Sequence, residues 1–432
     1  MLETVPKFTQ EKETINTMVS LELTGALKKI QDEYLFWDKA KYKNKGLNPA
    51  VFWSAIKMQR KLKNTSISFG KYTFTFHITD FMHRALHQFD LNIGGTLSSN
   101  IGISETDKTK FIISSLIEEA ISSSQMEGAN TTRKKAKEMI QKELKPKSNS
   151  EKMILNNYVT MKHIVQQKNE DLTPESLLYV HKLITSNTLE NTKEEGAFRK
   201  NDDIQVVNHI DGEVVHTPPK EENLNILLQE LCVFFNEDQE KFIHPIVKAC
   251  IIHFMIGWIH PFSDGNGRTA RALFYWYMLK RGYWLTEYMS ISRIIKDSKN
   301  QYEKAYLYTE IDDNDLNYFI TYHIKTMEKA FFALKTYINK KQKEVVQSAR
   351  FLKIPDVNDR MSQILKIVFD DADRVLASKE FEKRFDVSSF TARADLKKLT
   401  ELGFLEILQI NKIKKNYIKS SQFDNLLKNY DI

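Results

Sequence analysis

The sequence predicts a mainly α-helical protein, and three observations support that expectation. Glycine (14) and proline (9) are scarce among the 432 residues, so few positions would interrupt a helix. Apolar residues recur at helical spacing over long stretches. Alternating, strand-like patterns are confined to a few short segments, which fit hairpins placed between the helices.

Composition excludes several classes of protein. Charged residues of both signs make up 28% of the chain, and no uninterrupted apolar stretch reaches the roughly 20 residues that cross a bilayer. The segment Met1 to Gln10 is polar where a secretory signal would be apolar. Cys232 and Cys250 are too few for a disulfide framework or a zinc cluster and fit buried, inert thiols. We therefore expect a cytoplasmic protein without a membrane partner. The formal charge of +7 does not by itself predict binding to nucleic acid.

The first part of the chain, residues 1–110, combines helical patterning with a short hairpin, Thr65 to Phe69 and Tyr72 to Phe76. Helical spacing follows from Phe111 to Met126 and again from about Asn149 to Thr188. The basic stretch between these helices, residues 133–147, is expected to be a solvated face.

A second hairpin is expected in residues 204–217, where two β-branched runs flank the turn Asp211-Gly212. Pro218 and Pro219 close this segment. Helical patterning then resumes in four stretches, about Glu221 to Asn236, Pro245 to Ile259, Gly267 to Lys280 and Asp315 to about Ser348. Gly282 supplies a stop signal after the third.

The chemistry is concentrated in the run from His260 to Arg271, HPFSDGNGRTAR. Two glycines flank an asparagine just before a helix, so the backbone can turn tightly and direct free amides at an anion that the helix dipole also attracts. Arg268 and Arg271 share one face of the first helical turn and suit the oxygens of a triphosphate. Asp264 is the ligand type that Mg²⁺ prefers, and His260 can accept a proton near neutral pH. Each feature alone fits an ordinary cap, turn or surface pair, but their density in one loop favours a site.

The loop fits no other phosphate motif, because it lacks the P-loop pattern and its G-x-G follows a helix where the dinucleotide fingerprint needs a strand. It resembles the Fic family, whose signature HPFx(D/E)GNGRxxR is matched at every specified position from His260 to Arg271. The resemblance extends over much of residues 111–324 and implies a helical Fic core with the second hairpin as its flap. Most Fic enzymes are protein adenylyltransferases, which transfer AMP from ATP to a protein hydroxyl.

The resemblance implies a role for each residue of the motif. His260 would deprotonate a Ser, Thr or Tyr hydroxyl of a target protein or of the protein itself, and that hydroxyl would attack the α-phosphorus of ATP. Asp264 would hold Mg²⁺ on the α- and β-phosphates. The amides of Gly265, Asn266 and Gly267 and the Asn266 side chain would stabilise the equatorial oxygens. Arg268 would hold the departing phosphates, Arg271 the γ-phosphate, and Phe262 would anchor the loop in the core.

The flap, residues 199–219, has a mechanical role in this interpretation. Its exposed edge, Ile204, Gln205, Val206 and Val207, would pair with an extended target segment and hold the hydroxyl in register. Arg199 at its base is a candidate support. An ordinary structural hairpin remains the alternative.

A carboxylate continues the apolar stripe of the helix expected in residues 111–128. The stripe comprises Ile113, Leu116, Ile117, Ala120 and Ser124, and Glu127 lies within roughly 40° of its centre. A buried carboxylate needs a cationic partner. The run Ser123 to Gly128 also resembles the family's inhibitory motif, (S/T)xxxE(G/N), whose Glu pairs with the second arginine of the signature, here Arg271. This resemblance implies an autoinhibited enzyme, although in some relatives the same Glu positions a water that removes AMP.

Past Pro355 the chain changes to a compact unit of short helices, with a boundary expected near Ile354. Phe381 to Leu405 has the spacing of a helix-turn-helix, capped by Ser388 or Ser389, and two strands, Phe404 to Gln409 and Lys415 to Lys419, would form a wing. The inward side chains are expected to be Phe390, Ala394, Leu396 and Leu399. The unit resembles a winged helix. Groove-reading candidates are Thr391, Arg393, Lys397 and Lys398, and phosphate-contact candidates are Lys412, Lys414, Lys415 and Lys419.

The sequence therefore predicts an N-terminal helical region (residues 1–110), a Fic domain (111–350) and a winged helix (355–432). Because residues 355–432 hold 14 Lys and Arg against 13 Asp and Glu, protein contact or a homodimer is as plausible as DNA binding. Two alternatives to an autoinhibited adenylyltransferase stay open. One is a DNA-binding transcriptional regulator with a Fic sensor core, and the other is a Fic transferase using another nucleotide, with Tyr302 and Tyr306 as candidates for the base contact.

Overall fold

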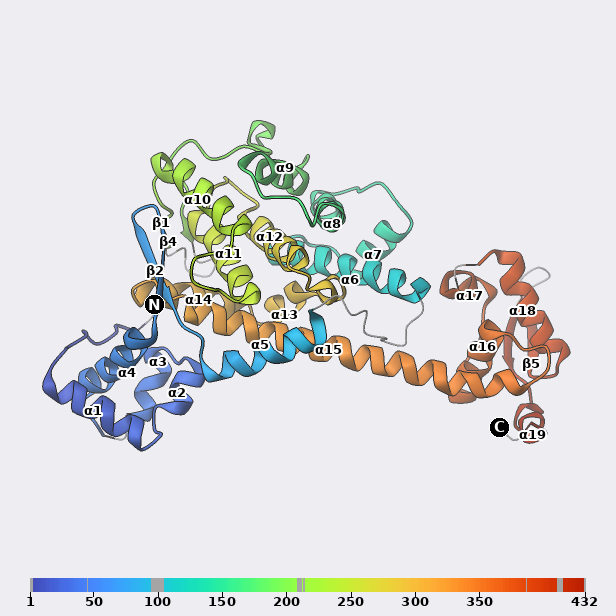
Figure 1. Ribbon diagram of the computed structural model, residues 1–432. Coiled ribbons are helices and arrows are strands. Elements are labelled where there is room, and N and C mark those ends of the chain that lie inside the picture. Colours follow the sequence, from blue (N-terminus) through green and yellow to red (C-terminus); the bar gives the residue numbers. More distant parts are fainter. Residues whose placement is uncertain are drawn as a thin grey trace. The chain divides into compact units, whose positions relative to one another are not determined.

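The computed structural model describes residues 3–44, 46–94, 105–207, 212, 214–385, 387–409 and 415–430. Helices dominate this part of the chain, and its strands form three separate antiparallel pairs (Figure 1). The mainly α-helical class is therefore confirmed. The N-terminal elements are α1 (Lys12–Leu23), α2 (Lys28–Glu33), α3 (Trp37–Ala40), α4 (Pro49–Lys63), β1 (Thr65–Phe69), β2 (Tyr72–Phe76) and α5 (Asp80–Ile93).

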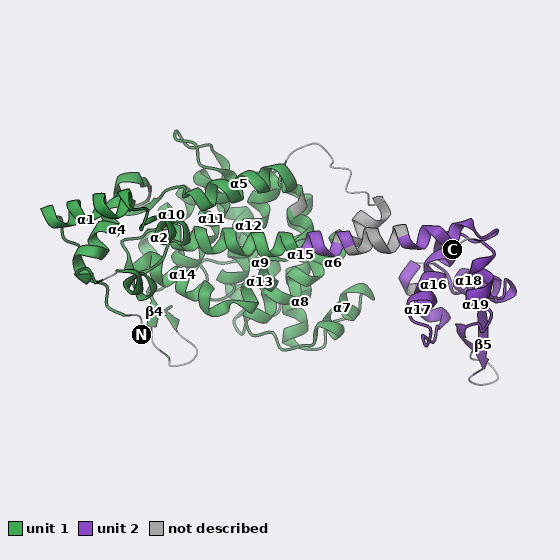
Figure 2. Cartoon of the chain, turned by 90° about the horizontal axis from the view of Figure 1, so that it is seen from below, with its two compact units in different colours: residues 1–332 green, residues 333–432 purple. Residues whose placement is uncertain are grey.

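The chain divides into two compact units, residues 1–332 and 333–432 (Figure 2). The division lies inside α15 (Asn317–Ala349), ahead of the boundary that the sequence places near Ile354. The reason is packing, because Phe351 and Ile354 are 0% and 1% exposed within the core of the second unit. Residues 1–110 belong to the first unit and do not form a compact unit of their own.

The central elements of the first unit follow in order along the chain. They are α6 (Glu105–Met126), α7 (Arg133–Gln141), α8 (Asn149–Gln166), α9 (Pro174–Thr185), β3 (Val206–Val207), β4 (Val214–His216), α10 (Leu224–Asn236), α11 (Pro245–Ile259), α12 (Asn266–Lys280), α13 (Ile291–Asp297) and α14 (Lys299–Ile311). Nearly every residue of α11 is buried because its sequence is apolar on all sides, so α11 lies at the centre of this unit. It packs along α12, and the loop between them carries the HPFSDGNGR run.

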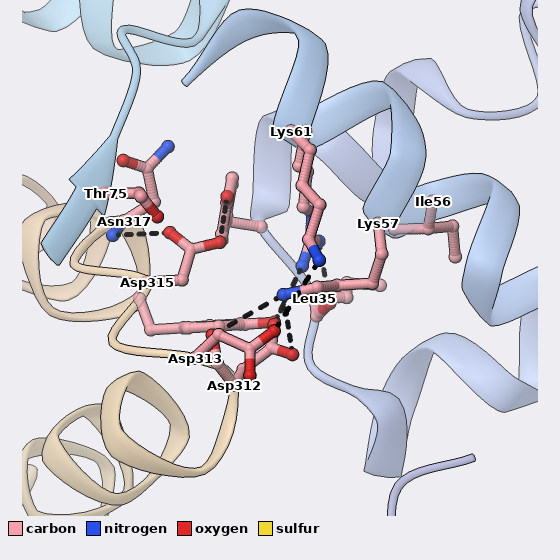
Figure 3. Close-up of polar contacts among 12 residues, drawn as sticks. Leu35, Ile56, Lys57, Lys61, Thr75, Asp312, Asp313, Asp315 and Asn317 are labelled. Carbon is pink, nitrogen blue, oxygen red and sulfur yellow. Dashed lines mark hydrogen bonds and ion pairs between the residues drawn. The ribbon is translucent and has the colours of Figure 1, made fainter. Parts of the chain in front are cut away.

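Buried charges join the N-terminal region to the turn between α14 and α15 (Figure 3). Lys57 Nζ lies 2.7 Å from Asp312 Oδ1, and both side chains are at most 6% exposed. Arg60 Nη1 donates a hydrogen bond to Tyr318 Oη at 2.7 Å and lies 4.0 Å from Asp312 Oδ2. Asp312 is thus the shared counter-charge of two buried cations.

Replacing Asp312 with asparagine is expected to lower the free energy of unfolding by about 3–5 kcal/mol, because Lys57 and Arg60 would stay buried without their nearest counter-charge. Asp313→Asn is the matched control, since the Asp313 side chain is 76% exposed and pairs with Lys61 at 3.8 Å. That change is expected to cost less than about 1 kcal/mol. Urea unfolding measures both, and equal losses in the two variants would contradict the role given to Asp312.

Two details of the first unit differ from the sequence prediction. The stripe on α6 is buried at Leu116, Ile117, Ala120 and Ser124, but Ile113 is 40% exposed. In the second hairpin, Val206 pairs with His216 and Val207 with Val214, so Ile204 and Gln205 precede the strand that was expected to include them. Asp211, half of the predicted turn, lies outside the described residues.

The second unit contains α16 (Asp359–Asp370), α17 (Ser378–Phe385), α18 (Ser389–Glu401), β5 (Leu405–Gln409), β6 (Lys415–Lys419) and α19 (Phe423–Lys428). Ser388 caps α18, and β5 pairs with β6 in antiparallel register. Phe390 and Ala394 do not point inward, since Phe390 is 82% exposed. The inward face follows Ala392, Leu396 and Leu399, together with Asp395, whose carboxylate is buried against Arg360 at 2.6 Å. Lys412 and Lys414 lie outside the described residues.

Within the described residues, no helix combines the length and the apolar composition that a bilayer crossing requires. Cys232 and Cys250 are both free and buried, as predicted. Burial raises the pKa of the Cys232 thiol to about 12 and also raises that of Cys250, so neither thiol ionises readily.

Candidate active site

The imidazole of His260 stands at the point where α11 ends. The residue adopts a left-handed conformation (φ 51°, ψ 57°), which stops the helix and turns the chain into the loop. His260 Nδ1 lies 3.1 Å from the carbonyl oxygen of Gly257, so Nδ1 carries the proton and Nε2 keeps its lone pair. Burial lowers the pKa of His260, and its hydrogen bond to Gly257 opposes this only in part. The ring is therefore a neutral proton acceptor near pH 7.

The loop after His260 is closed by the side chain of Asn266. Its Oδ1 accepts from the Phe262 amide at 3.0 Å, and its Nδ2 donates to the Phe262 carbonyl at 2.8 Å. Both polar atoms thus bind within the loop, whereas the family resemblance implied that this side chain contacts a phosphate. Gly265 has a φ of +83°, and a Cβ there would approach Thr185 and His181 at 3.1 and 3.3 Å, so glycine is required.

His181 on α9 supports the loop, and its only signal in the sequence is its place on a helical face. Its ring stacks on Phe262 with centroids 3.7 Å apart. Nε2 lies 2.9 Å from the Asp264 carbonyl, and Nδ1 accepts from the Gly196 amide at 3.0 Å. Burial lowers the pKa of His181 to about 4, so this ring is neutral and holds the loop with one donor and one acceptor.

Arg268 lies on the first turn of α12 and is 1% exposed. Its Nη1 donates to the Ile184 carbonyl at 3.3 Å, and Nη2 lies 3.4 Å from Asp264 Oδ2. In the part of the chain that the structure describes, Arg268 Nε has no hydrogen-bond partner. The first amides of α12, those of Asn266 and Gly267, have no acceptor within the helix. A buried cation with an unused donor beside free helix amides fits an anion.

Arg271, one turn further along α12, is bound by the end of α6. Its Nη2 donates to Glu127 Oε1 at 2.8 Å and to the Ser123 carbonyl at 3.1 Å, and its Nε donates to Ser123 Oγ at 2.8 Å. The structure therefore brings Glu127 and Ser123 to the second arginine of the motif. The Arg271 side chain is 3% exposed and that of Glu127 is 30% exposed, so the pair is only partly shielded from water.

Glu127 also lies against the start of α12. A Cβ on Gly267 would overlap Glu127 Oε1, so glycine at this position is what lets the carboxylate approach the helix. Burial works to raise the pKa of Glu127, but Arg271, with smaller contributions from Arg268 and Lys299, holds the pKa below its usual range. An ionised carboxylate thus lies where the helix dipole attracts anions.

Arg199 joins the base of the flap to the loop. Its amide donates to the Pro261 carbonyl at 2.9 Å, and its Nε donates to the His260 carbonyl at 3.1 Å. Its Nη2 donates to the carbonyl of Pro219, at the other end of the hairpin. Val207 is 42% exposed, and β3 pairs only with β4 among the described residues. The hairpin therefore leaves one strand edge without a strand partner in that part of the chain.

Tyr302 and Tyr306, the candidates for a base contact, lie on α14. Tyr302 Oη is 2.9 Å from His253 Nε2, and Tyr306 Oη is 3.4 Å from the His253 carbonyl. A Cβ on Gly257 would overlap Tyr306 Oη, so Tyr306 packs against the last turn of α11. Both phenols are half-buried, and burial raises the pKa of Tyr302 to about 12.

Comparisons with known proteins agree with this geometry. Residues 171–278 match the model of the Fic/DOC family. A Protein adenylyltransferase Fic from Culex quinquefasciatus is 34% identical over 116 residues, 27% of this chain and 21% of that protein. A protein of the same name from Drosophila melanogaster is 33% identical over 113 residues, 26% of this chain and 21% of that protein. The chain spans about a fifth of the length of these relatives.

A solved structure has the same fold at low sequence identity. The crystal structure of a Fic family protein from Desulfovibrio desulfuricans G20 aligns with a TM-score of 0.51 and 17% identity, covering 78% of this chain and 94% of that chain. The matched residues 171–278 include the whole run from His260 to Arg271. The chain is therefore similar to the Fic/DOC family over residues 171–278.

Proposed function

We propose that the protein is an adenylyltransferase that moves AMP from ATP to a Ser, Thr or Tyr hydroxyl of a target protein and of itself. The observation that carries this proposal is the Nε of buried Arg268, which has no hydrogen-bond partner among the described residues. It lies on the first turn of α12, whose first amides have no acceptor within the helix, and the unprotonated Nε2 of His260 is on the preceding loop. One group accepts a proton while the others neutralise phosphate charge, which is what nucleotidyl transfer requires.

In this proposal each residue has one task. His260 takes the proton of the attacking hydroxyl as the oxygen bonds to the α-phosphorus, and the bond from that phosphorus to the bridging oxygen breaks to release pyrophosphate. The amides of Asn266 and Gly267 stabilise the equatorial oxygens. The Gly265 amide already donates to Asp264 Oδ1 and serves the loop. Arg268 binds the departing phosphates, and Arg271 binds the γ-phosphate once Glu127 releases it.

Magnesium fits one residue of the loop. No group of three or more His, Cys, Asp or Glu suited to a metal occurs within the described residues. Asp264, whose side chain is 59% exposed, would hold Mg²⁺ together with phosphate oxygens, as is usual for this ion. When bound, the ion neutralises phosphate charge.

The flap would position the target. The edge of β3 at Val206 and Val207, which has no strand partner among the described residues, can accept an extended segment through main-chain hydrogen bonds. Such bonds place a hydroxyl in register over the loop with little demand on the target's sequence. Arg199 would keep this edge fixed to His260, since it binds the carbonyls of His260 and Pro219.

Glu127 would act as a brake. While it binds Arg271, the γ-phosphate lacks its cation, and ATP would bind with an unproductive α-phosphate. The resting activity is therefore expected to be low. The same carboxylate lies beside the anion site, where it can also position a water, so removal of AMP from a modified target is part of this proposal.

The second unit fits a winged helix that contacts protein, including a second copy of this chain. Two of its groove-reading candidates already have acidic partners, Lys397 with Glu401 at 3.5 Å and Lys398 with Asp356 at 3.0 Å. Phe390, at the start of α18, is 82% exposed, and an exposed aromatic suits a protein interface better than a phosphate backbone. Salt-dependent retention of DNA by the full chain would instead favour a DNA-binding regulator.

The position of the radiolabel in ATP, on the α- or the γ-phosphate, identifies the transferred group. The Glu127→Gly variant incubated with α-labelled ATP is expected to label itself and proteins in a lysate, whereas γ-labelled ATP leaves them unlabelled because pyrophosphate departs. The Glu127→Gly/His260→Ala double variant is the control and should stay unlabelled. Label from the γ-position, or transfer only from another nucleoside triphosphate, would overturn AMP as the transferred group.

A further inference from the structure

His216, the last residue of β4, has a polar partner at each ring nitrogen. Nδ1 lies 2.7 Å from Glu310 Oε2 on α14. Nε2 lies 2.7 Å from the carbonyl oxygen of Trp258 in the last turn of α11. The side chain is 8% exposed, so water does not substitute for either partner.

These two partners determine the protonation of the ring. A carboxylate and a carbonyl both accept hydrogen bonds, and a neutral imidazole has only one N–H to donate. Both contacts are satisfied together when both nitrogens carry protons. His181 shows the contrast, because its Nδ1 accepts from the Gly196 amide and its Nε2 faces a carbonyl, which needs one proton only. His216 therefore fits an imidazolium, and His181 a neutral ring.

The ring joins three elements at the catalytic loop. It ties the returning strand of the flap to α14 through Glu310 and to α11 through Trp258, two residues before His260. Arg199 ties the other end of the hairpin to the His260 carbonyl. The position of the flap over His260 thus depends on two side chains, Arg199 and His216.

We propose that His216 is a positioning residue for AMP transfer and that it acts as an imidazolium bridging Glu310 and the Trp258 carbonyl. This inference rests on the proposed function. While both hydrogen bonds of His216 are present, the target hydroxyl bound at the flap keeps a fixed position relative to His260 at the end of α11. When the ring loses a proton, one of the two bonds is lost and the hydroxyl is held less well.

The charged groups around His216 support this assignment. Glu310 pairs with it from α14, and the charge of His216 acts on His260 at the end of α11, which also feels the charges of Glu127 and Arg199. The charge of His216 adds to burial in lowering the pKa of His260. A protonated His216 thus helps His260 to stay neutral, so the positioning residue and the base require opposite protonation states.

The pH dependence has a definite sign. Transfer should fall at acid pH as His260 gains a proton, and it should fall again at alkaline pH as His216 loses one. The Glu310→Gln variant separates the loss of transfer at acid pH from the loss at alkaline pH. A glutamine amide can donate to Nδ1 of a neutral ring while Nε2 still donates to Trp258, so the bridge survives without the charge.

The experiment measures kcat and the KM for ATP from pH 5.5 to 9 in the Glu127→Gly protein, alone and with Glu310→Gln, Glu310→Ala or His216→Gln. The Glu127→Gly protein should lose about 10- to 100-fold in kcat at alkaline pH, and Glu310→Gln should remove that alkaline loss. Glu310→Ala and His216→Gln should lower kcat at pH 7 with little change in the KM for ATP, because the hydrogen bonds of His216 go to Glu310 and the Trp258 carbonyl and not to Arg268 or Arg271. An alkaline limb that persists unchanged in Glu310→Gln would overturn the proposal.

A second measurement does not depend on activity. Nitrogen NMR of the histidine rings in the unaltered protein, with His216 assigned from the His216→Gln spectrum, should show both nitrogens protonated at pH 7. One protonated nitrogen would refute the imidazolium even if transfer is seen. Absence of transfer in Glu127→Gly at every pH would instead refute the proposed function, and the NMR result would still decide the state of His216.

Discussion

Replacing Glu127 with glycine is expected to raise self-modification with ATP by about 10- to 100-fold. The γ-phosphate can reach Arg271 only when the contact between Glu127 Oε1 and Arg271 Nη2, 2.8 Å long, is broken. A hydrogen bond to a charged group contributes about 1.5–3 kcal/mol, which corresponds to about one to two factors of ten. The contact from Ser123 to Arg271 remains in this variant and keeps the guanidinium in place.

Two other variants test whether the rise in self-modification comes from freeing Arg271. Glu127→Gln fills the same space without the charge, so its activity should lie between those of the unaltered protein and Glu127→Gly. Glu118→Gln is the matched control, because Glu118 is also on α6, has a side chain only 13% exposed, and pairs with Arg133 away from the loop. Radiolabel incorporated per minute measures all three. A rise in Glu118→Gln equal to that in Glu127→Gly would show that loosening α6, and not freeing Arg271, is responsible.

Acid should not release this brake. Burial acts to raise the pKa of Glu127, but the pKa lies below its usual range because Arg271, Arg268 and Lys299 together favour the charged carboxylate more than burial disfavours it. A depressed pKa means that the pair is present at neutral pH and is lost only as pH falls through that lower value. Lowering the pH to 5 is therefore expected to leave the unaltered protein far less active than the Glu127→Gly protein at the same pH, which controls for protonation of His260.

The sequence predicted the parts of the site that local pattern controls. The bounds of α11, Pro245–Ile259, follow from an apolar run with a proline at its start and a histidine at its end. The turn at Gly265 follows from the positive φ that glycine permits. The contact of Glu127 with Arg271 was predicted from helical projection together with the family resemblance, because the projection alone named no partner.

The contacts and side-chain orientations that the sequence did not predict depend on packing between residues far apart in the chain. His181 is separated by 83 residues from Asp264, and nothing local marks it as the support of the loop. The Asn266 side chain was assigned to phosphate from the family resemblance, and in the structure the backbone of Phe262 offers it both a donor and an acceptor at short range. Phe390 was placed in the core by its hydrophobicity, although the inward face of α18 is set by Ala392, Leu396 and Leu399. Residue type gives a preference, and the packed partner settles the orientation.

Removing the imidazole of His260 is expected to lower kcat by about 10²–10⁴-fold in the Glu127→Gly protein, the usual contribution of a positioned general base. The hydrogen bond of the His260 ring explains why this imidazole acts as the base. Nδ1 is held by the Gly257 carbonyl, so only Nε2 can take the hydroxyl proton. The KM for ATP should change little, since Arg268, Arg271 and the amides of α12 bind the phosphates without His260.

The choice of substitution matters because His260 also ends α11 in a left-handed conformation. Asparagine tolerates that conformation, and its amide can donate to the Gly257 carbonyl, so His260→Asn removes the base and keeps the helix end. Burial lowers the pKa of His260, and loss of Glu127 removes a charge that raises it, so the acid limb of Glu127→Gly should lie below pH 6.5. In Glu127→Gly/His260→Asn the residual transfer should lose that limb. If transfer stays within threefold of the Glu127→Gly rate and keeps the acid limb, another group removes the proton, and the loop serves only to bind phosphate.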